Sequence, residues 1–143
     1  MAIVEIKPQI IKEIAEYLDM GMVCYYHKTN GELVSLPDPL RDLSYDDDEW
    51  RQEEKRVKKN AKDYLRFEGM TSRESFRIME DFVEQIPHQP TRDKFIEAIT
   101  RKKPFAQFKN LMGYYGDLED EWFAYKLKRE IEFVNEQLEA YNL

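Results

Sequence analysis

Residues 22–37 read Met-Val-Cys-Tyr-Tyr-His-Lys-Thr-Asn-Gly-Glu-Leu-Val-Ser-Leu-Pro, and this stretch decides the class of fold. Asn30 and Gly31 are the preferred pair for a two-residue type I′ turn, because both central positions of that turn require positive φ. A two-residue loop would place Tyr25 opposite Leu36. We therefore predict a β-hairpin over about 22–37. Its apolar side chains share one face, which we expect to be buried: Val23, Tyr25, Val34 and Leu36.

The segments around this hairpin alternate between helical and strand patterns. A first helix is expected over residues 7–20, because Pro8 suits a first helical turn and apolar residues follow at spacings of three and four. Leu65 and Phe67 would share one face of a third strand over Tyr64–Phe67. Between the hairpin and that strand lies an acidic connection over residues 38–49. A charged helix follows it, in which Glu53 and Glu54 are set near Lys58 and Lys59.

The chain after Gly69 has a helical pattern to its end. Thr71 and Glu74 have the spacing of a capping box, which predicts a helix start. The helix that follows has the apolar stripe Phe76, Met79, Phe82, Val83 and Ile86. A short helix is expected over 91–101, another starts at Pro104, and Asp117 caps a last helix. The pattern predicts an α+β fold: a small antiparallel sheet of about three strands with packed helices and a helical C-terminal half over about 71–142. We interpret residues 1–143 as a single domain.

Composition limits the classes of function. The chain has 143 residues, 42% hydrophobic and 13% aromatic, which favours a folded protein. A formal charge of −7 opposes non-specific attachment to phosphate backbones or anionic lipid. The single cysteine, Cys24, excludes an intrachain disulfide and suits a reducing compartment. The first residues lack the pattern of a signal peptide, and no apolar run is long enough to span a bilayer. We expect a cytoplasmic protein that does not associate with a membrane.

Three segments carry a resemblance to a known group of bacterial proteins. They are residues 24–33 (Cys-Tyr-Tyr-His-Lys-Thr-Asn-Gly-Glu-Leu), residues 75–83 (Ser-Phe-Arg-Ile-Met-Glu-Asp-Phe-Val), and residues 95–109 with Glu121-Trp122-Phe123 after them. In their content and order they resemble Uncharacterised Protein Family 0158, over about Met22 to Phe133. The chain departs from the family pattern where a glycine is usual, at Lys103 or Pro104, and where a tryptophan is frequent, near Phe133. The function of that family is unknown, so the resemblance implies a fold and no chemistry.

The most distinctive candidate site is a basic and aromatic segment over residues 92–109. Its charged side chains are Arg92, Lys94, Arg101, Lys102, Lys103 and Lys109, against Asp93 and Glu97, which gives a local charge of +4. Phe105 and Phe108 lie among these cations. Such a mixture can bind phosphates and stack on bases. The alternative is a solvated face paired with the acidic residues 117–121, with both rings in the core. The residues of a partner or anion site would be Arg101, Lys102, Lys103 and Lys109.

Other candidate sites have weaker patterns. The acidic run 46–49 lacks the ligand spacing of a calcium loop and is better interpreted as residues at a helix start. Cys24 and His27 point to opposite faces of a strand, so a thiol enzyme is not expected unless His88 approaches one of them. Arg77 and Glu80 have the spacing of a helical salt bridge. We predict no catalytic, cofactor or metal residues.

Three hypotheses of function follow, in order of preference. The first is a non-catalytic interaction or regulatory module that binds a protein partner. The second is a binder of single-stranded RNA or a nucleotide through the basic segment. The third is an enzyme of unrecognised type that uses ionisable side chains such as His27, Glu80 and Glu121. The sequence leaves the oligomeric state open.

Overall fold

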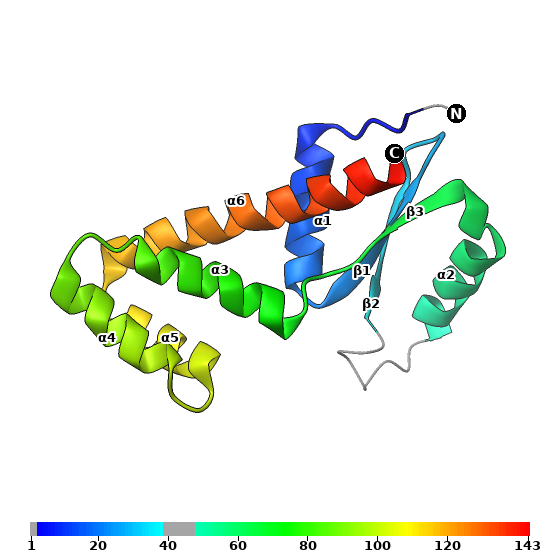
Figure 1. The fold of residues 1–143 in the computed structure, drawn as a ribbon. Coiled ribbons are helices and arrows are strands. Elements are labelled where there is room, and N and C mark those ends of the chain that lie inside the picture. Colours follow the sequence, from blue (N-terminus) through cyan, green and yellow to red (C-terminus); the bar gives the residue numbers. More distant parts are fainter. Residues whose placement is uncertain (1–2, 39–47) are drawn as a thin grey trace. The chain divides into compact units, whose positions relative to one another are not determined.

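The computed structural model describes residues 3–38 and 48–143, with the side chains of Asp48 and Glu49 left aside (Figure 1). The chain divides into two compact units. The first, the sheet unit, comprises Met1–Gly69 and Glu130–Leu143. The second, the helical unit, comprises Met70–Arg129. Whether the two form a single domain, as the sequence suggests, stays a prediction.

The sheet unit contains every strand of the described chain. Its elements are α1 (Pro8–Asp19), β1 (Met22–His27), β2 (Leu33–Pro37), α2 (Asp48–Lys59), a 3₁₀ turn (Ala61–Asp63) and β3 (Tyr64–Phe67), together with the end of α6 (Gly116–Tyr141). The strand order is β2-β1-β3, and both pairings are antiparallel. With helices filling the C-terminal half, this confirms the α+β prediction, and the third strand begins and ends at the predicted residues.

The hairpin forms, but the predicted two-residue loop is wrong. Tyr25 pairs with Val34 rather than with Leu36, so the loop has four residues, 28–31. The reason is the His27 side chain, whose Nδ1 accepts hydrogen bonds from the backbone N–H groups of Thr29 and Asn30, each at 3.2 Å. In the loop only Gly31 has positive φ, at +75°, which excludes a type I′ turn. A shift of two residues keeps each side chain on its face.

Both faces of the sheet are covered, whereas the sequence predicts only one buried face. On the predicted face, Val23, Val34 and Leu36 pack against Val57 of α2 and Tyr64. The opposite face carries a second core, with α1 and the end of α6 packed against the sheet. Its buried residues are Ile11, Ile14, Ala15, Leu18, Cys24, Leu65, Phe67 and Val134. The short sheet is therefore the middle layer of its unit.

Polar contacts attach the C-terminus to this unit. The Tyr141 hydroxyl donates to the Arg66 carbonyl, and the Gln137 amide donates to the Glu68 carbonyl at 2.9 Å. The Asn142 side chain makes two 3.0 Å hydrogen bonds with the backbone of Val4. These bonds hold the last turns of α6 within the sheet unit.

The helical unit contains α3 (Ser72–Glu84), α4 (Gln89–Ile99), α5 (Pro104–Met112) and the first part of α6. The predicted capping box is present, since Thr71 Oγ1 accepts from the Glu74 N–H and Glu74 accepts from the Thr71 N–H. The core of the unit is rich in aromatic and long apolar side chains: Met79, Phe82, Val83, Ile86, Phe95, Ile99, Phe108 and Met112. Trp122 and Tyr125 of α6 pack against it.

Several predicted helix details need correction. α4 spans Gln89–Ile99 rather than 91–101, and its first turn accommodates Pro90. Asp117 is in the first turn of α6, which already begins at Gly116. In α2, Lys58 pairs with Glu54 as expected, but Glu53 bonds to Arg56. The predicted acidic connection lies almost wholly within 39–47, outside the described residues, as does most of the run 46–49.

Candidate interaction surface of the helical unit

The cations predicted from the sequence gather where the chain reverses between α4 and α5. Arg101, Lys102 and Lys103 are the three residues of this connection that precede Pro104, the first residue of α5. Lys103 has φ of 56°, and it is the only non-glycine residue with positive φ among those described. Lys109 lies farther along α5. We call Arg101, Lys102, Lys103 and Lys109 the basic corner.

The members of the basic corner differ in how they are paired. Arg101 Nη2 donates to Glu97 Oε1 one turn earlier in α4, at 2.5 Å. Lys102, Lys103 and Lys109 are exposed, and no ion pair of theirs occurs within residues 3–38 and 48–143. Arg92 is different in kind, because its guanidinium donates to the Ile86 carbonyl at 2.9 Å and so connects α4 to the end of α3.

The two aromatic residues of the segment separate into core and surface. Phe108 is only 4% exposed, and its ring meets Phe95 at 5.5 Å and Trp122 at 4.9 Å between centroids. It belongs to the core and is closed to a ligand. Phe105 is 44% exposed, and its ring makes a T-shaped contact with Phe76 at 6.3 Å between centroids. One half-exposed ring therefore accompanies the cations.

The acidic residues that the sequence offers as internal partners are not paired with these cations. Asp117, Asp120 and Glu121 are exposed on the first turns of α6, and Glu119 is half-buried there. In the part of the chain that is described, no salt bridge joins any of them to the basic corner. The basic corner and the acidic residues at the start of α6 therefore do not neutralise each other.

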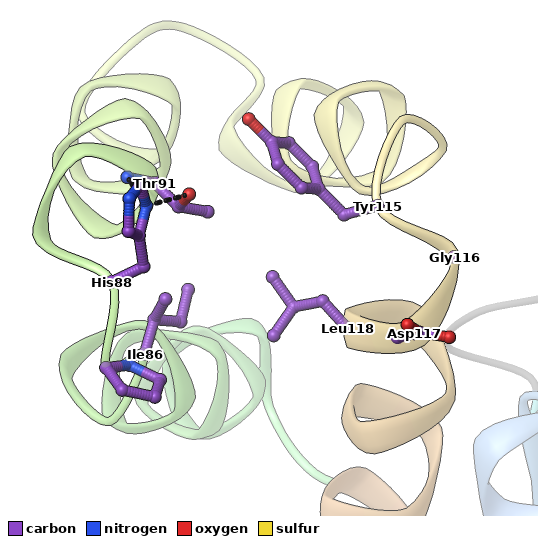
Figure 2. Close-up of a pocket in the computed structure, with 8 residues that line it drawn as sticks. Ile86, His88, Thr91, Tyr115, Gly116, Asp117 and Leu118 are labelled. Atoms are coloured by element: carbon purple, nitrogen blue, oxygen red, sulfur yellow. Dashed lines mark hydrogen bonds between the residues drawn. The ribbon is translucent and has the colours of Figure 1, made fainter.

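An open cleft, which the sequence analysis did not find, lies at the other end of α4 (Figure 2). It measures about 590 Å³ and is lined by Ile86, Pro87, His88, Thr91, Tyr115, Gly116, Asp117 and Leu118. The imidazole of His88 caps α4, since its Nδ1 lies 2.8 Å from Thr91 Oγ1 and accepts from the Thr91 N–H at 3.3 Å. In the sequence, the Pro87–Pro90 segment could have indicated this cleft, because it holds a histidine at a helix start.

A network of three polar groups joins α3 to α6 within the same unit. Arg129 Nη1 donates to Asp81 Oδ2 at 2.9 Å and to the Tyr125 hydroxyl. Asp81 also accepts from Arg77 Nε at 3.2 Å. The predicted Arg77–Glu80 bridge is therefore replaced by an i,i+4 pair. The bond to Asp81 raises the pKa of Arg129.

The sheet unit holds a second network at the edge of α2. Tyr64 Oη and Arg56 Nη1 both donate to Glu32 Oε1 at 2.9 Å. These two hydrogen bonds, Tyr64 first, lower the pKa of Glu32. Burial and the bond to Glu32 raise the pKa of Tyr64. The network connects the hairpin loop to α2 and β3, a structural role.

The two residues considered for thiol chemistry are separated by the sheet. Cys24 is fully buried on one face, and His27 lies on the other, with its ring against Tyr64 at 5.0 Å. Burial, and secondly the charge of Glu13, raise the pKa of the Cys24 thiol to about 12. His88 is engaged by Thr91, in the helical unit. His27, Glu80 and Glu121 are not among the residues that line the cleft.

Two searches for other kinds of site concern only the described residues. No three His, Cys, Asp or Glu side chains in residues 3–38 and 48–143 are grouped so that they could hold a metal ion. None of the helices seen there is long and apolar enough to cross a membrane.

These features define an α+β protein with a three-stranded antiparallel sheet and a helical unit that carries the exposed charge clusters. The chain belongs to the uncharacterised protein family UPF0158, whose family model matches residues 3–143. This confirms the resemblance seen in the sequence and extends it over the first helix. Searches of curated proteins and of solved structures find no match to the chain.

Proposed function

We propose that this protein is a non-catalytic interaction module whose basic corner binds an acidic segment of a protein partner. The observation that carries the proposal is the exposure of Lys102, Lys103 and Lys109 without an ion pair in the described chain, beside the half-exposed ring of Phe105. Cations around an apolar contact suit a peptide that carries carboxylates and an apolar side chain. The cytoplasm is the expected compartment, supported by a single buried thiol.

Single-stranded RNA is the second candidate, favoured by the same cations and by Phe105. Bases stack on exposed rings, and phosphates bind lysines in a salt-dependent manner. Phe108 is buried and cannot act as a second stacking platform. The net charge of −7 also opposes a polyanion over most of the surface. An acidic peptide needs only the local positive field, so we rank it first.

Binding of two labelled probes tests the proposal. The probes are a peptide of alternating acidic and leucine residues and an oligouridylate, each titrated by fluorescence anisotropy at low and moderate salt. The test variant combines Lys102→Glu, Lys103→Glu and Lys109→Glu. The matched control combines Lys12→Glu, Lys55→Glu and Lys59→Glu, which changes the net charge equally at exposed lysines of the sheet unit.

We expect the test variant to bind the peptide about 10- to 100-fold more weakly than the wild type, as three screened charge contacts predict. The control should stay within about threefold. Peptide binding that is equal in the test variant and the wild type would overturn the assignment of the basic corner. Oligouridylate binding that depends on these lysines, without peptide binding, would favour the RNA alternative instead.

A further inference from the structure

The loop of the β-hairpin is held by one imidazole ring. His27 Nδ1 accepts hydrogen bonds from the backbone N–H groups of Thr29 and Asn30, each at 3.2 Å. A backbone N–H can only donate, so Nδ1 must keep its lone pair, and the neutral ring carries its proton on Nε2. Gly31 completes the loop, with its N–H bonded to the His27 carbonyl at 3.1 Å. The four-residue loop therefore requires a neutral ring.

A proton on Nδ1 disrupts this arrangement. Nδ1 then becomes a donor that faces two further donors, and both backbone hydrogen bonds are lost. The Thr29 hydroxyl lies 3.1 Å from Nδ1 and can rotate to accept from it, but a backbone N–H cannot accept. Each hydrogen bond contributes about fivefold to an equilibrium constant. Protonation therefore weakens the four-residue loop by roughly 25-fold relative to a loop that does not use Nδ1.

Charges of both signs surround the ring. The titratable groups next to it, from the loop, α2, the 3₁₀ turn and β3, are Lys28, Glu32, Arg56, Lys62, Asp63, Tyr64 and Arg66. The carboxylate of Glu32 attracts an imidazolium, but it already accepts from Arg56 and Tyr64, each at 2.9 Å. The positive charge of Arg56 opposes a second cation at this place. The hydrogen bonds at Nδ1 therefore decide which loop the charged ring accepts.

The sequence provides a second loop that does not need Nδ1. Asn30–Gly31 is the preferred pair for a two-residue type I′ turn. That turn pairs Tyr25 with Leu36, whereas the structure pairs Tyr25 with Val34. The two registers differ by two residues, so each side chain of β2 keeps its face. β2 lies at the edge of the order β2-β1-β3, so it can slide without displacing another strand.

We propose that the hairpin is a pH-sensitive switch between these two registers, with His27 as the sensor. The observed register remains the major one, because in it the apolar side chains of β2 pack against Val57. The two bonds to Nδ1 stabilise it while the ring is neutral, and they are lost as pH falls and the ring takes up a proton. An imidazole changes its charge between about pH 5 and 8. The second register then rises about 25-fold, to a population above about 1%.

The second register changes how the hairpin is joined to α2. In it Glu32 lies opposite Thr29 instead of His27, roughly 7 Å farther from Tyr64 along the strand. The hydrogen bonds that connect Glu32 to Tyr64 and to Arg56 of α2 are then lost. The basic corner takes no part in this change, so the switch and the proposed function can each fail without the other.

Chemical exchange saturation transfer in NMR spectra of the full chain tests the proposal. Backbone signals of β2 report the population of the minor state, and ring signals of His27 report its protonation between pH 8 and pH 5. We expect the minor population to rise in step with the protonation of the ring. His27→Asn is the matched control, because its Oδ1 replaces Nδ1 as acceptor and does not titrate, so its minor population should stay low. His27→Gln lacks an acceptor at this position and should show a raised population already at pH 8.

A disulfide identifies the register of the minor state. Cys24 lies opposite Ser35 in the observed register, and the bond from the His27 N–H to the Glu32 carbonyl makes this a non-hydrogen-bonded pair. The Cα atoms of such pairs are close enough for a disulfide. In the second register Ser35 lies opposite Tyr26. Ser35→Cys, oxidised during refolding, should therefore show no exchange at any pH, and the reduced form should keep it.

Four results would overturn the switch. The first is a His27 ring that becomes protonated without a rise of the minor population. The second is the same pH response in His27→Asn, and the third is a low minor population in His27→Gln at pH 8. The fourth is a minor state that persists in the oxidised Ser35→Cys variant, since that state would then not be the second register.

Discussion

The guanidinium of Arg129 donates a hydrogen bond of 2.9 Å to the carboxylate of Asp81, which joins α6 to α3 inside the helical unit. Asp81 accepts a second bond from Arg77, and Arg129 also lies over the Tyr125 ring at 5.6 Å from its centroid. Both partners of the bridge are about three-quarters covered, with side-chain exposures of 27% and 25%. The bridge therefore supports the frame from which the basic corner and the cleft are presented.

Asp81→Asn should destabilise the protein by about 1–3 kcal/mol, because two arginines lose a charged acceptor in a partly buried position. Urea unfolding followed by circular dichroism measures the change. Glu84→Gln is the matched control, since Glu84 is exposed on the same helix, and it should change stability by less than about 0.5 kcal/mol. Equal effects of the two substitutions would show that the bridge contributes nothing.

The Glu32 network predicts a pH-dependent part of the stability. The pKa of Glu32 lies below its ordinary value of 4.5 because Tyr64 and Arg56 donate to the carboxylate. A lowered folded pKa stabilises the protein above the unfolded pKa, and this contribution is lost as pH falls through the folded value. The stability difference between wild type and Glu32→Gln should be at most about 1 kcal/mol at pH 7, because the pair is exposed. It should fade below about pH 4. A difference that is constant with pH would contradict the role of the charge.

The buried thiol of Cys24 should resist modification. A pKa of about 12 makes the thiolate about a thousandfold rarer at pH 8 than for the ordinary value of 9.0. We expect alkylation of the native protein to be at least about 100-fold slower than in strong denaturant, followed by mass spectrometry. Rapid alkylation of the folded chain would mean that the thiol is accessible and would reopen the question of a reactive cysteine.

The backbone at Lys103 adopts a conformation that favours glycine. Its φ of 56° is in the left-handed region, where glycine is favoured and a side chain costs about 1 kcal/mol. Lys103→Gly should therefore leave stability unchanged or raise it by up to about 1 kcal/mol. Lys102→Gly, at the neighbouring residue with ordinary φ, should not stabilise. Thermal unfolding of both variants measures these changes in stability. A marked loss of stability in Lys103→Gly alone would contradict backbone strain at Lys103.

The stability that His88 gives to the start of α4 should depend on a hydrogen-bond acceptor at this position and not on the imidazole ring itself. His88→Ala should cost about 1 kcal/mol, because the Thr91 N–H loses its acceptor at the start of α4. His88→Asn should retain most of the stability, since an asparagine oxygen caps in the same way. Unfolding curves in urea compare the two. A similar loss in both variants would indicate that the ring itself is needed.

Local chemistry explains which features the sequence predicts. The capping box of Thr71 and Glu74 and the strand Tyr64–Phe67 depend on neighbours within a few residues, and both are present. The hairpin register depends on the His27 side chain, which bonds to the loop backbone and overrides the Asn30–Gly31 preference. Pattern alone does not show such a bond.

Tertiary contacts explain what the sequence does not predict. The second core on the sheet requires the end of α6, more than a hundred residues after α1. The cleft requires the end of α3, the start of α4 and the α5–α6 turn to meet. For the candidate site, the exposed lysines were predicted correctly as residues, but only the fold separates Phe105 at the surface from Phe108 in the core.

Affinity purification from the native cell extract tests the central claim most directly. The tagged wild type, the triple variant Lys102→Glu, Lys103→Glu and Lys109→Glu, and the matched control of the sheet unit would each be purified with and without nuclease. We predict a protein partner that survives nuclease, is retained by the control and is lost from the triple variant. A partner that is retained by the triple variant, or one that disappears with nuclease, would contradict a protein-binding basic corner.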